Sequence, residues 1–416
     1  MKKITVINMY GKKNIGDMAI RNSALEILEE AFGINSFTFL CESIEDFPIK
    51  AKIKSKFEKH YAPYGYAIRA TAKTVPQIMK FMRFMGIVIL SASYALLGLI
   101  SQKLIPKKGF YRYIEDLKNA DLVVAMGGGY FITSDAVKDF FGIGLNLLPF
   151  YIAKLYKKKI IILPSSFGPF ASSVHEQLAG NAVKNTLFMV REEISLKLAK
   201  KYNTRSVFIP DLALYDWKDD VDRKTDNYFV LTLRTGLTFG HDHQLKVEKE
   251  IVTFVQEVYT KWGFRCKFIP MASNVIEEND LIVATRINNA IFDKRIFHLE
   301  RVNTPADVKR ILKHAQFSVC NRLHSAILSA TVYTPFITMS YAHKTLGFMD
   351  NFNLKKWNLA MNIVSSNTLL NSVADLMKQK NKRTYIKTLI QDRKVVQAYR
   401  NILIMDLRKS TTDIFI

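Results

Sequence analysis

Three cationic or potentially cationic side chains lie in one short, largely apolar stretch of the sequence, NRLHSAILSATVYTPFITMSYAHK. Arg322 and His324 stand where the apolar run FSVC passes into a helical pattern, and Lys344 follows the next apolar run, PFITMSY. If these runs are neighbouring parallel strands, their carboxyl ends bring the three groups to one place. Positive charges so close together repel unless an anion lies between them. The spacing therefore predicts a site for a strongly anionic ligand, with an imidazole able to transfer a proton near neutral pH.

A fourth cation, Arg234, ends the apolar run YFVLTLR. An arginine at the carboxyl end of an inner strand points toward the ligand edge of a parallel sheet. Its guanidinium can pair with two oxygens of a carboxylate or phosphate at once. An ion pair between domains is the other interpretation, and we favour anion binding.

Two further segments follow apolar runs in the first third of the sequence. MGGGYF contains Gly127, Gly128 and Gly129, whose backbone can approach a ligand closely or cradle an anion. A tight strand-to-helix connection explains the same glycines.

GKKNIGD places Asn14 and Asp17 before the first predicted helix. An aspartate there is typical of a helix cap, and it could also accept a hydrogen bond or a proton from a sugar hydroxyl.

No metal site is predicted. His241 and His243 flank Asp242, but no third ligand lies nearby in the sequence, so the pattern favours a solvated loop. The chain also lacks a phosphate-binding loop of the Walker type, a GxSxG elbow and a paired-cysteine cluster. We therefore expect no metal and no redox cofactor.

The elements that must position these residues are strands alternating with helices. Short apolar runs separated by helical patterns predict an α/β fold with parallel, doubly wound sheets. The polar segment YDWKDDVDRKTDN, residues 215–227, reads as a linker. We predict two Rossmann-like domains facing each other across a cleft: an N-terminal domain of residues 1–214 and a C-terminal domain of residues 228–365. Basic helices follow over residues 366–416.

Composition limits the choice of partner. The chain of 416 residues carries 60 Lys and Arg against 37 Asp and Glu, a formal net charge of +23. Such an excess suggests a nucleic acid, an acidic membrane surface or a phosphorylated substrate. Cys41, Cys266 and Cys320 lie far apart in apolar contexts, which indicates buried thiols in a reduced compartment. The N-terminus enters a strand pattern without signal-peptide features, so we expect a cytoplasmic protein.

One segment has no charge over 19 residues, from Phe84 to Gln102, and Arg83 and Lys103 flank it. Its length is at the threshold for crossing a bilayer. Three interpretations compete: a helix lying in the bilayer surface, a helix buried in the protein, and a transmembrane helix. The cationic flanks favour the surface helix, which would place the protein at the inner face of the cell membrane.

Seven segments of the chain, in order, resemble the polysaccharide pyruvyltransferases: NIGDMAI, DLVVAMGGGYF, LPSSFGPF, VREEISLKLAKKY, IPDLALY, VLTLR and NRLHSAILSATVYTPFITMSYAHKTLGF. The resemblance runs from about residue 4 to residue 350. It implies a fold like that of the two-domain GT-B glycosyltransferases. It also implies transfer of pyruvate from phosphoenolpyruvate, a co-substrate, to a sugar of a cell-surface polysaccharide or its lipid-linked precursor, with a pyruvate ketal and free phosphate as products.

Carried over position by position, the resemblance implies that His324 and Lys344 are the catalytic pair and that Arg234 and Arg322 bind the donor. The residues implied for the acceptor side or its loops are Asn14, Asp17, Gly127, Gly128, Gly129 and Ser166. The sequence departs from the family at Ser165, where the family often has Gln, and in the apolar segment after residue 76.

Two other functions remain open at this point. A GT-B glycosyltransferase would use a nucleotide-sugar, and Asp307 in VNTPADV offers an acidic residue for the ribose but no glycine loop for the diphosphate. A non-catalytic basic protein that binds membrane or nucleic acid would explain the charge. Dispersed cations without interleaved aromatic residues argue against nucleic acid.

Overall fold

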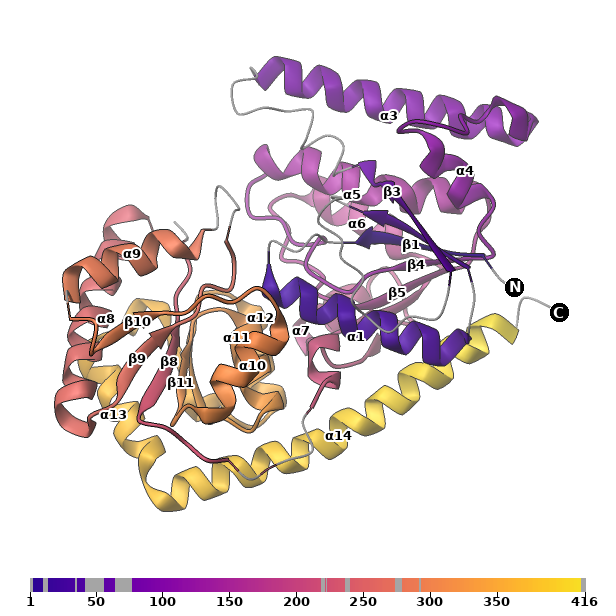
Figure 1. Ribbon diagram of the computed structural model, residues 1–416. Coiled ribbons are helices and arrows are strands. Elements are labelled where there is room, and N and C mark those ends of the chain that lie inside the picture. The colour runs from indigo at the N-terminus through magenta and orange to yellow at the C-terminus, as the bar shows by residue number, and fades with distance from the viewer. Residues whose placement is uncertain are drawn as a thin grey trace. The chain divides into compact units, whose positions relative to one another are not determined.

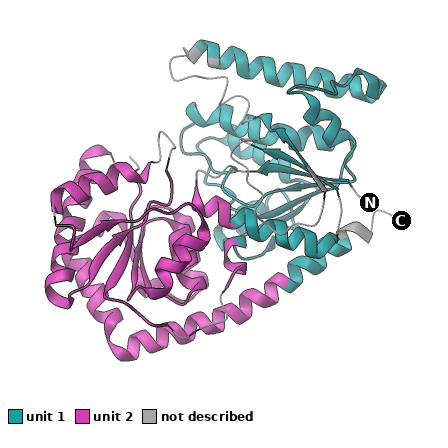
Figure 2. Ribbon diagram, viewed as in Figure 1, with its two compact units in different colours: residues 1–12, 20–212, 401–416 teal, residues 13–19, 213–400 magenta. Residues whose placement is uncertain are grey.

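The computed structural model describes residues 3–9, 14–33, 36–41, 56–63, 77–217, 221, 223–235, 240–273, 279–291 and 293–412. The chain divides into two compact units (Figure 2). The first comprises residues 1–12, 20–212 and 401–416, and the second comprises residues 13–19 and 213–400. The predicted domain limits stay a prediction, because compactness does not test whether either part folds alone.

The first unit is built on a parallel sheet with the strand order β3-β2-β1-β4-β5-β6-β7. The strands are β1 (Lys3–Met9), β2 (Ser36–Cys41), β3 (Lys56–Tyr61), β4 (Leu122–Ala125), β5 (Ile160–Ser165), β6 (Leu187–Val190) and β7 (Val207–Phe208). The helices are α1 (Ile15–Phe32), whose first turn belongs to the second unit, α3 (Gln77–Ile100), α4 (Arg112–Lys118), α5 (Lys138–Leu155), α6 (Ser173–Val183) and α7 (Glu193–Ala199).

The second unit has a parallel sheet with the order β10-β9-β8-β11-β12-β13. Its strands are β8 (Tyr228–Thr232), β9 (Arg265–Phe268), β10 (Phe297–Leu299), β11 (Ser318–Cys320), β12 (Phe336–Ser340) and β13 (Asn358–Ala360). Its helices are α8 (His241–Trp262), α9 (Asp280–Ile291), α10 (Pro305–His314), α11 (Leu323–Thr331), α12 (His343–Asn351), α13 (Ser366–Met377) and α14 (Gln379–Thr412), whose last residues belong to the first unit.

Helices lie on both sides of each sheet (Figure 1). Central strands such as β4 and β5 are therefore buried at every position, and their sequences are continuous apolar runs rather than alternating ones. This pattern confirms the predicted α/β class with two Rossmann-like units. The predicted solvated loop at His241 and His243 is wrong, because both residues lie in the first turn of α8.

The apolar segment forms most of α3, which lies over α4 and α5 on their side away from the sheet (Figure 1). Phe84 packs edge-on against Phe140 and Phe141 of α5. The Tyr113 hydroxyl of α4 donates a hydrogen bond to Ser91 Oγ at 2.6 Å. One side of α3 is thus fixed to the first unit.

Candidate functional site

The site in the second unit lies at the carboxyl ends of β8, β11 and β12. The strand order of this sheet reverses between β8 and β11, which are adjacent and parallel. In a doubly wound sheet, this reversal opens the crevice in which ligands bind. Arg234 follows β8, Arg322 and His324 follow β11, and Lys344 follows β12, which pairs with β11. The sequence-based expectation of adjacent strand ends is confirmed.

The half-buried side chain of Tyr341 lies beside these cations, and they change the pKa of its hydroxyl. The guanidinium carbon of Arg234 lies 4.5 Å from the centre of the Tyr341 ring. Burial by itself would raise the pKa of the Tyr341 hydroxyl. The positive charges of Lys344, Arg234 and Arg322, with a hydrogen bond from Arg234, outweigh burial and lower this pKa. Three predicted cations therefore act on one hydroxyl group, which sequence reasoning did not single out.

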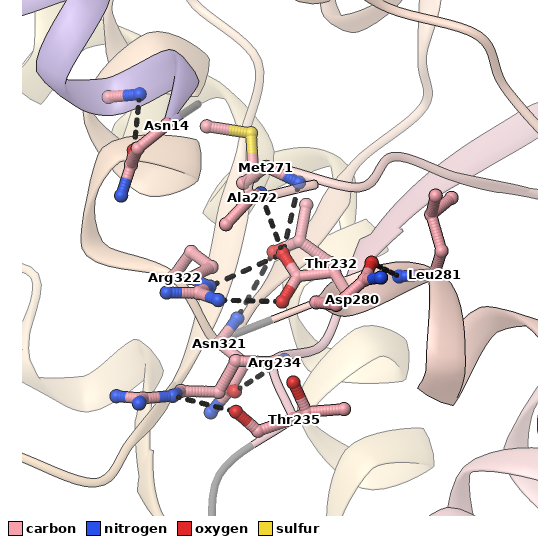
Figure 3. Close-up of polar contacts among 12 residues, drawn as sticks. Asn14, Thr232, Arg234, Thr235, Met271, Ala272, Asp280, Leu281, Asn321 and Arg322 are labelled. Atoms are coloured by element: carbon pink, nitrogen blue, oxygen red, sulfur yellow. Dashed lines mark hydrogen bonds and ion pairs between the residues drawn. The ribbon is translucent and has the colours of Figure 1, made fainter. Parts of the chain in front are cut away.

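Arg322 has a carboxylate partner inside the protein. Its Nη2 lies 2.7 Å from Oδ1 of Asp280, and its Nε lies 3.3 Å from Oδ2 (Figure 3). Asp280 opens α9 and is fully buried. Burial raises the pKa of Asp280, while the charge and hydrogen bonds of Arg322 counteract this rise. Clustered positive charges require an anion near Arg322, and the carboxylate of Asp280 is one such anion.

Asp280 also holds the loop that follows β9. Its Oδ2 accepts hydrogen bonds from the backbone N–H groups of Met271 and Ala272, each at 3.0 Å (Figure 3). The carbonyl of Met271 in turn accepts a hydrogen bond from the N–H of Ile15 at 2.9 Å, and Asn14 forms a β-bridge with Ala272. The buried carboxylate thus connects the Arg322 side chain to the beginning of α1.

The beginning of α1 fixes His324. A Cβ atom built on Gly16 would lie 2.1 Å from His324 Nδ1 and 2.3 Å from its Cγ. Only glycine leaves room for the imidazole to pack directly on the backbone at this helix terminus. His324 itself lies in the first turn of α11. The ring is therefore held between the N-terminal turns of two helices, α1 and α11.

Asn14, rather than Asp17, caps α1. The Asn14 Oδ1 atom accepts hydrogen bonds from the N–H groups of Gly16 at 2.8 Å and Asp17 at 3.4 Å. Asp17 lies within the first turn of the helix, where a carboxylate interacts favourably with the helix dipole. The cap interpretation of Asp17 is wrong, and both residues belong to the unit that carries His324.

Asn321 joins the three strand ends, and it is another residue that sequence reasoning missed. Its Oδ1 accepts a hydrogen bond from the N–H of Arg234 at 3.0 Å, and its Nδ2 donates to the carbonyl of Met339 at 2.9 Å. Its own N–H donates to the carbonyl of Thr232 at 3.1 Å. A buried amide that links β8, β11 and β12 sets the spacing between Arg234 and the residues that follow β11.

Two of the three glycines in MGGGYF take part in backbone contacts within the first unit. A Cβ on Gly127 would lie 2.5 Å from the carbonyl oxygen of Pro164, so a larger residue would push the ends of β4 and β5 apart. The carbonyl of Gly128 accepts a hydrogen bond from the N–H of Ser166 at 2.9 Å. Gly129 is exposed, with room for a Cβ. The tight-turn interpretation accounts for Gly127.

Ser166 belongs to a buried polar cluster. Its hydroxyl donates to Glu192 Oε1 at 2.6 Å and accepts from Arg191 Nε at 2.9 Å. Arg191 also pairs with Asp211 at 2.6 Å, and Glu192 accepts from Ser195 at 2.9 Å. These contacts within the first unit explain the VREEIS segment and give Ser166 a structural role.

Asp307, the acidic residue considered for a nucleotide ribose, is used elsewhere. Its Oδ2 accepts hydrogen bonds from the N–H of Thr304 at 3.0 Å and from the Thr304 hydroxyl at 2.9 Å. The Thr304 hydroxyl accepts from the N–H of Asp307, which completes a capping box at the start of α10. The cap explains VNTPADV without a ligand.

Comparisons with known proteins agree with this architecture. The family model "Polysaccharide pyruvyl transferase" matches residues 14–343. The chain is 23% identical over 308 residues to the amylovoran biosynthesis protein AmsJ of Erwinia amylovora, which covers 63% of this chain and 71% of AmsJ.

Solved structures show the fold. The UDP complex of MnaA from S. aureus superposes with a TM-score of 0.58 at 12% identity, covering 94% of this chain and 91% of that one. Sucrose-phosphate synthase from Thermosynechococcus elongatus gives a TM-score of 0.57 at 12% identity, covering 100% and 99%. At these identities the likeness concerns the fold alone, which is of the GT-B type.

Proposed function

Because the chain belongs to the polysaccharide pyruvyl transferase family, we propose that it transfers pyruvate from phosphoenolpyruvate to a sugar of a cell-surface polysaccharide or its lipid-linked precursor. The family and the relationship to AmsJ support a transferase in polysaccharide biosynthesis. The donor and the ketal product are our proposal. The observation that carries it is the placement of Arg234, Arg322, His324 and Lys344 after the adjacent parallel strands β8, β11 and β12, with the Arg234 guanidinium 4.5 Å from the Tyr341 ring.

The charge of the site suits this donor. Phosphoenolpyruvate carries a carboxylate and a phosphate with about two negative charges near neutral pH. Asp280 offsets the charge of Arg322, and Arg234 and Lys344 add positive charge at the neighbouring strand ends, which suits an anionic donor. The N-termini of α11 and α12 lie at the same edge of the sheet and favour negative charge.

The reaction can be assigned to named residues. His324 as imidazolium protonates C3 of phosphoenolpyruvate, C2 becomes electrophilic, and a sugar hydroxyl forms the first C2–O bond. The C2–O bond to phosphate then breaks while Lys344 and Arg234 stabilise the departing phosphate. A second sugar hydroxyl attacks C2 and closes the ketal. Of the two hydroxyl protons released, one restores the imidazolium and the other leaves with phosphate or solvent; Asp17 is our candidate for accepting one of them.

The test is phosphate release by the purified protein with phosphoenolpyruvate and the polysaccharide repeat unit as acceptor. We expect His324→Ala to lower kcat by about 10²- to 10⁴-fold, because proton transfer by a positioned side chain contributes that much. His298→Ala is the matched control, since His298 lies on β10 with an exposed side chain. Unchanged activity in His324→Ala would remove His324 from the mechanism.

A thermal-shift experiment separates this proposal from a nucleotide-sugar transferase. Phosphoenolpyruvate at about 100 times its Kd should stabilise the protein by about 2.7 kcal/mol. UDP-sugars at equal concentration should leave Tm unchanged. Stabilisation by a UDP-sugar alone would favour the glycosyltransferase instead.

A further inference from the structure

The exposed side of α3 is apolar along almost its whole length. The buried positions Phe84, Ile87, Ser91, Ala95 and Gly98 recur every three or four residues and face the first unit. On the other side, the exposed large apolar residues are Ile78, Met79, Met82, Ile89, Leu90, Leu96, Leu97, Leu99 and Ile100. An ordinary surface helix of a soluble protein carries polar residues on this side. The apolar side of α3 therefore requires another explanation.

Contacts along the buried side hold α3 against the unit and argue against a transmembrane orientation. The hydroxyl of Tyr156 donates to the carbonyl of Ala95 at 2.8 Å, and a Cβ on Gly98 would lie 2.3 Å from that hydroxyl oxygen. A Cβ on Gly144 would lie 3.0 Å from Phe84. Crossing a bilayer would require α3 to abandon these contacts at both ends, although it is long and apolar enough to span.

Positively charged residues come directly after the apolar segment in the sequence. The segment from Phe84 to Gln102 has no charged residue. The lysines that follow it, Lys103, Lys107 and Lys108, are exposed. Lysines beside an apolar helix face suit the anionic headgroups of a bilayer. A contact between two protein copies would instead have to bring these lysines together or supply acidic partners.

We propose that the exposed side of α3 lies in the headgroup region of an anionic membrane, with the helix parallel to the bilayer plane. Among the three interpretations that the sequence allowed, the packing of α3 favours the surface helix. The buried stripe holds the helix on the protein, the apolar side enters the lipid, and the lysines contact the headgroups. This inference does not depend on the proposed reaction.

The experiment compares vesicle binding of three forms of the full chain by co-sedimentation, using vesicles of phosphatidylglycerol and phosphatidylcholine. The test variant carries Ile89→Glu, Leu96→Glu and Ile100→Glu, at positions that are 55%, 55% and 80% exposed. The control carries Val137→Glu, Val174→Glu and Ile194→Glu, at positions in the same unit that are 66%, 52% and 52% exposed. Both variants change the net charge equally and leave the core intact.

We expect the test variant to lose vesicle binding by about 100-fold or more, because three apolar side chains no longer enter lipid. The control should bind like the unchanged chain. Replacing Lys103, Lys107 and Lys108 by Gln should weaken binding to anionic vesicles by about fivefold per lysine and leave binding to neutral vesicles unchanged. Equal binding of the test variant and the control would overturn the proposal.

Two further outcomes would also overturn it. Retention of the protein in cell membranes after alkaline carbonate extraction would indicate a transmembrane helix. A dimer in light scattering that dissociates in the test variant, without vesicle binding by the unchanged chain, would assign the apolar side to a second copy. Phosphate release with a water-soluble acceptor should be equal in all forms, so failure here is distinguishable from failure of the proposed reaction.

Discussion

The contact between Gly16 and His324 gives a quantitative prediction for Gly16→Ala. The new Cβ would lie 2.1 Å from Nδ1 and 2.7 Å from Cβ of His324, against an ordinary contact of about 3.5–4.0 Å between heavy atoms. The ring must therefore retreat by about 1.5 Å. A catalytic group misplaced by about 1 Å can cost about 10²-fold in rate. We expect kcat for phosphate release to fall by that factor or more.

Stability should respond much less than activity. Overpacking costs about 1–3 kcal/mol, and replacing Gly by Ala in a helix returns about 1 kcal/mol. The free energy of unfolding of Gly16→Ala should therefore fall by about 0–2 kcal/mol. Gly86→Ala is the matched control, because Gly86 lies inside α3 and has nothing within 4 Å of its Cβ position.

A double-mutant cycle tests whether the contact with the His324 ring causes the effect of Gly16→Ala. In a His324→Ala background the new methyl group has no ring to displace and meets only the Cβ atom at 2.7 Å, so Gly16→Ala should destabilise that background less than it destabilises the unchanged chain. Denaturant unfolding of the four forms gives the coupling energy. The reasoning is refuted if Gly16→Ala keeps kcat within threefold of the unchanged chain and the cycle shows no coupling.

Three further changes have defined outcomes. Asp280→Asn leaves the Arg322 guanidinium buried without its charged partner, so the free energy of unfolding should fall by about 3–5 kcal/mol. Added phosphate should then raise Tm more in the variant than in the unchanged chain. Equal Tm shifts would argue against an anion site beside Arg322. Absorbance difference titration against Tyr341→Phe should show a phenol with a pKa below its usual value, and phosphoenolpyruvate should raise that pKa by neutralising the surrounding cations. Burial raises the pKa of Asp392 to about 7, above its unfolded value, so its contribution to stability is full below about pH 4 and is lost as pH rises through 7. Asp392→Asn should raise Tm at pH 8.5 and not at pH 4, and a pH-independent change would contradict this cause.

The strand ends of the second unit could be predicted because the signal is local. Apolar runs ending in Arg234, in Arg322 and before Lys344 identify strand ends, and parallel α/β topology then places these ends at one edge. Nothing in the run EEND identifies Asp280 as the carboxylate that folds against Arg322. That contact joins residues 42 positions apart.

Other features depended on distant packing. Asn14 and Asp17 are both good cap residues, and only backbone geometry shows that the Asn14 side chain accepts the helix N–H groups. The contact of Gly16 with His324 joins two distant parts of the chain, and no local sequence pattern predicts that they meet. Strand β3, with the charged sequence KFEKHY, was missed because edge strands need no apolar run.

The three cysteines make the chain suitable for site-specific labelling. Cys41, Cys266 and Cys320 are free thiols and all buried, as the sequence indicated. Burial raises the pKa of Cys41 to about 12 and also raises the pKa of the other two, so little reactive thiolate forms near neutral pH. A single cysteine introduced at exposed Ser93 of α3 would therefore take up a fluorophore or spin label alone. No native residue would have to be removed first.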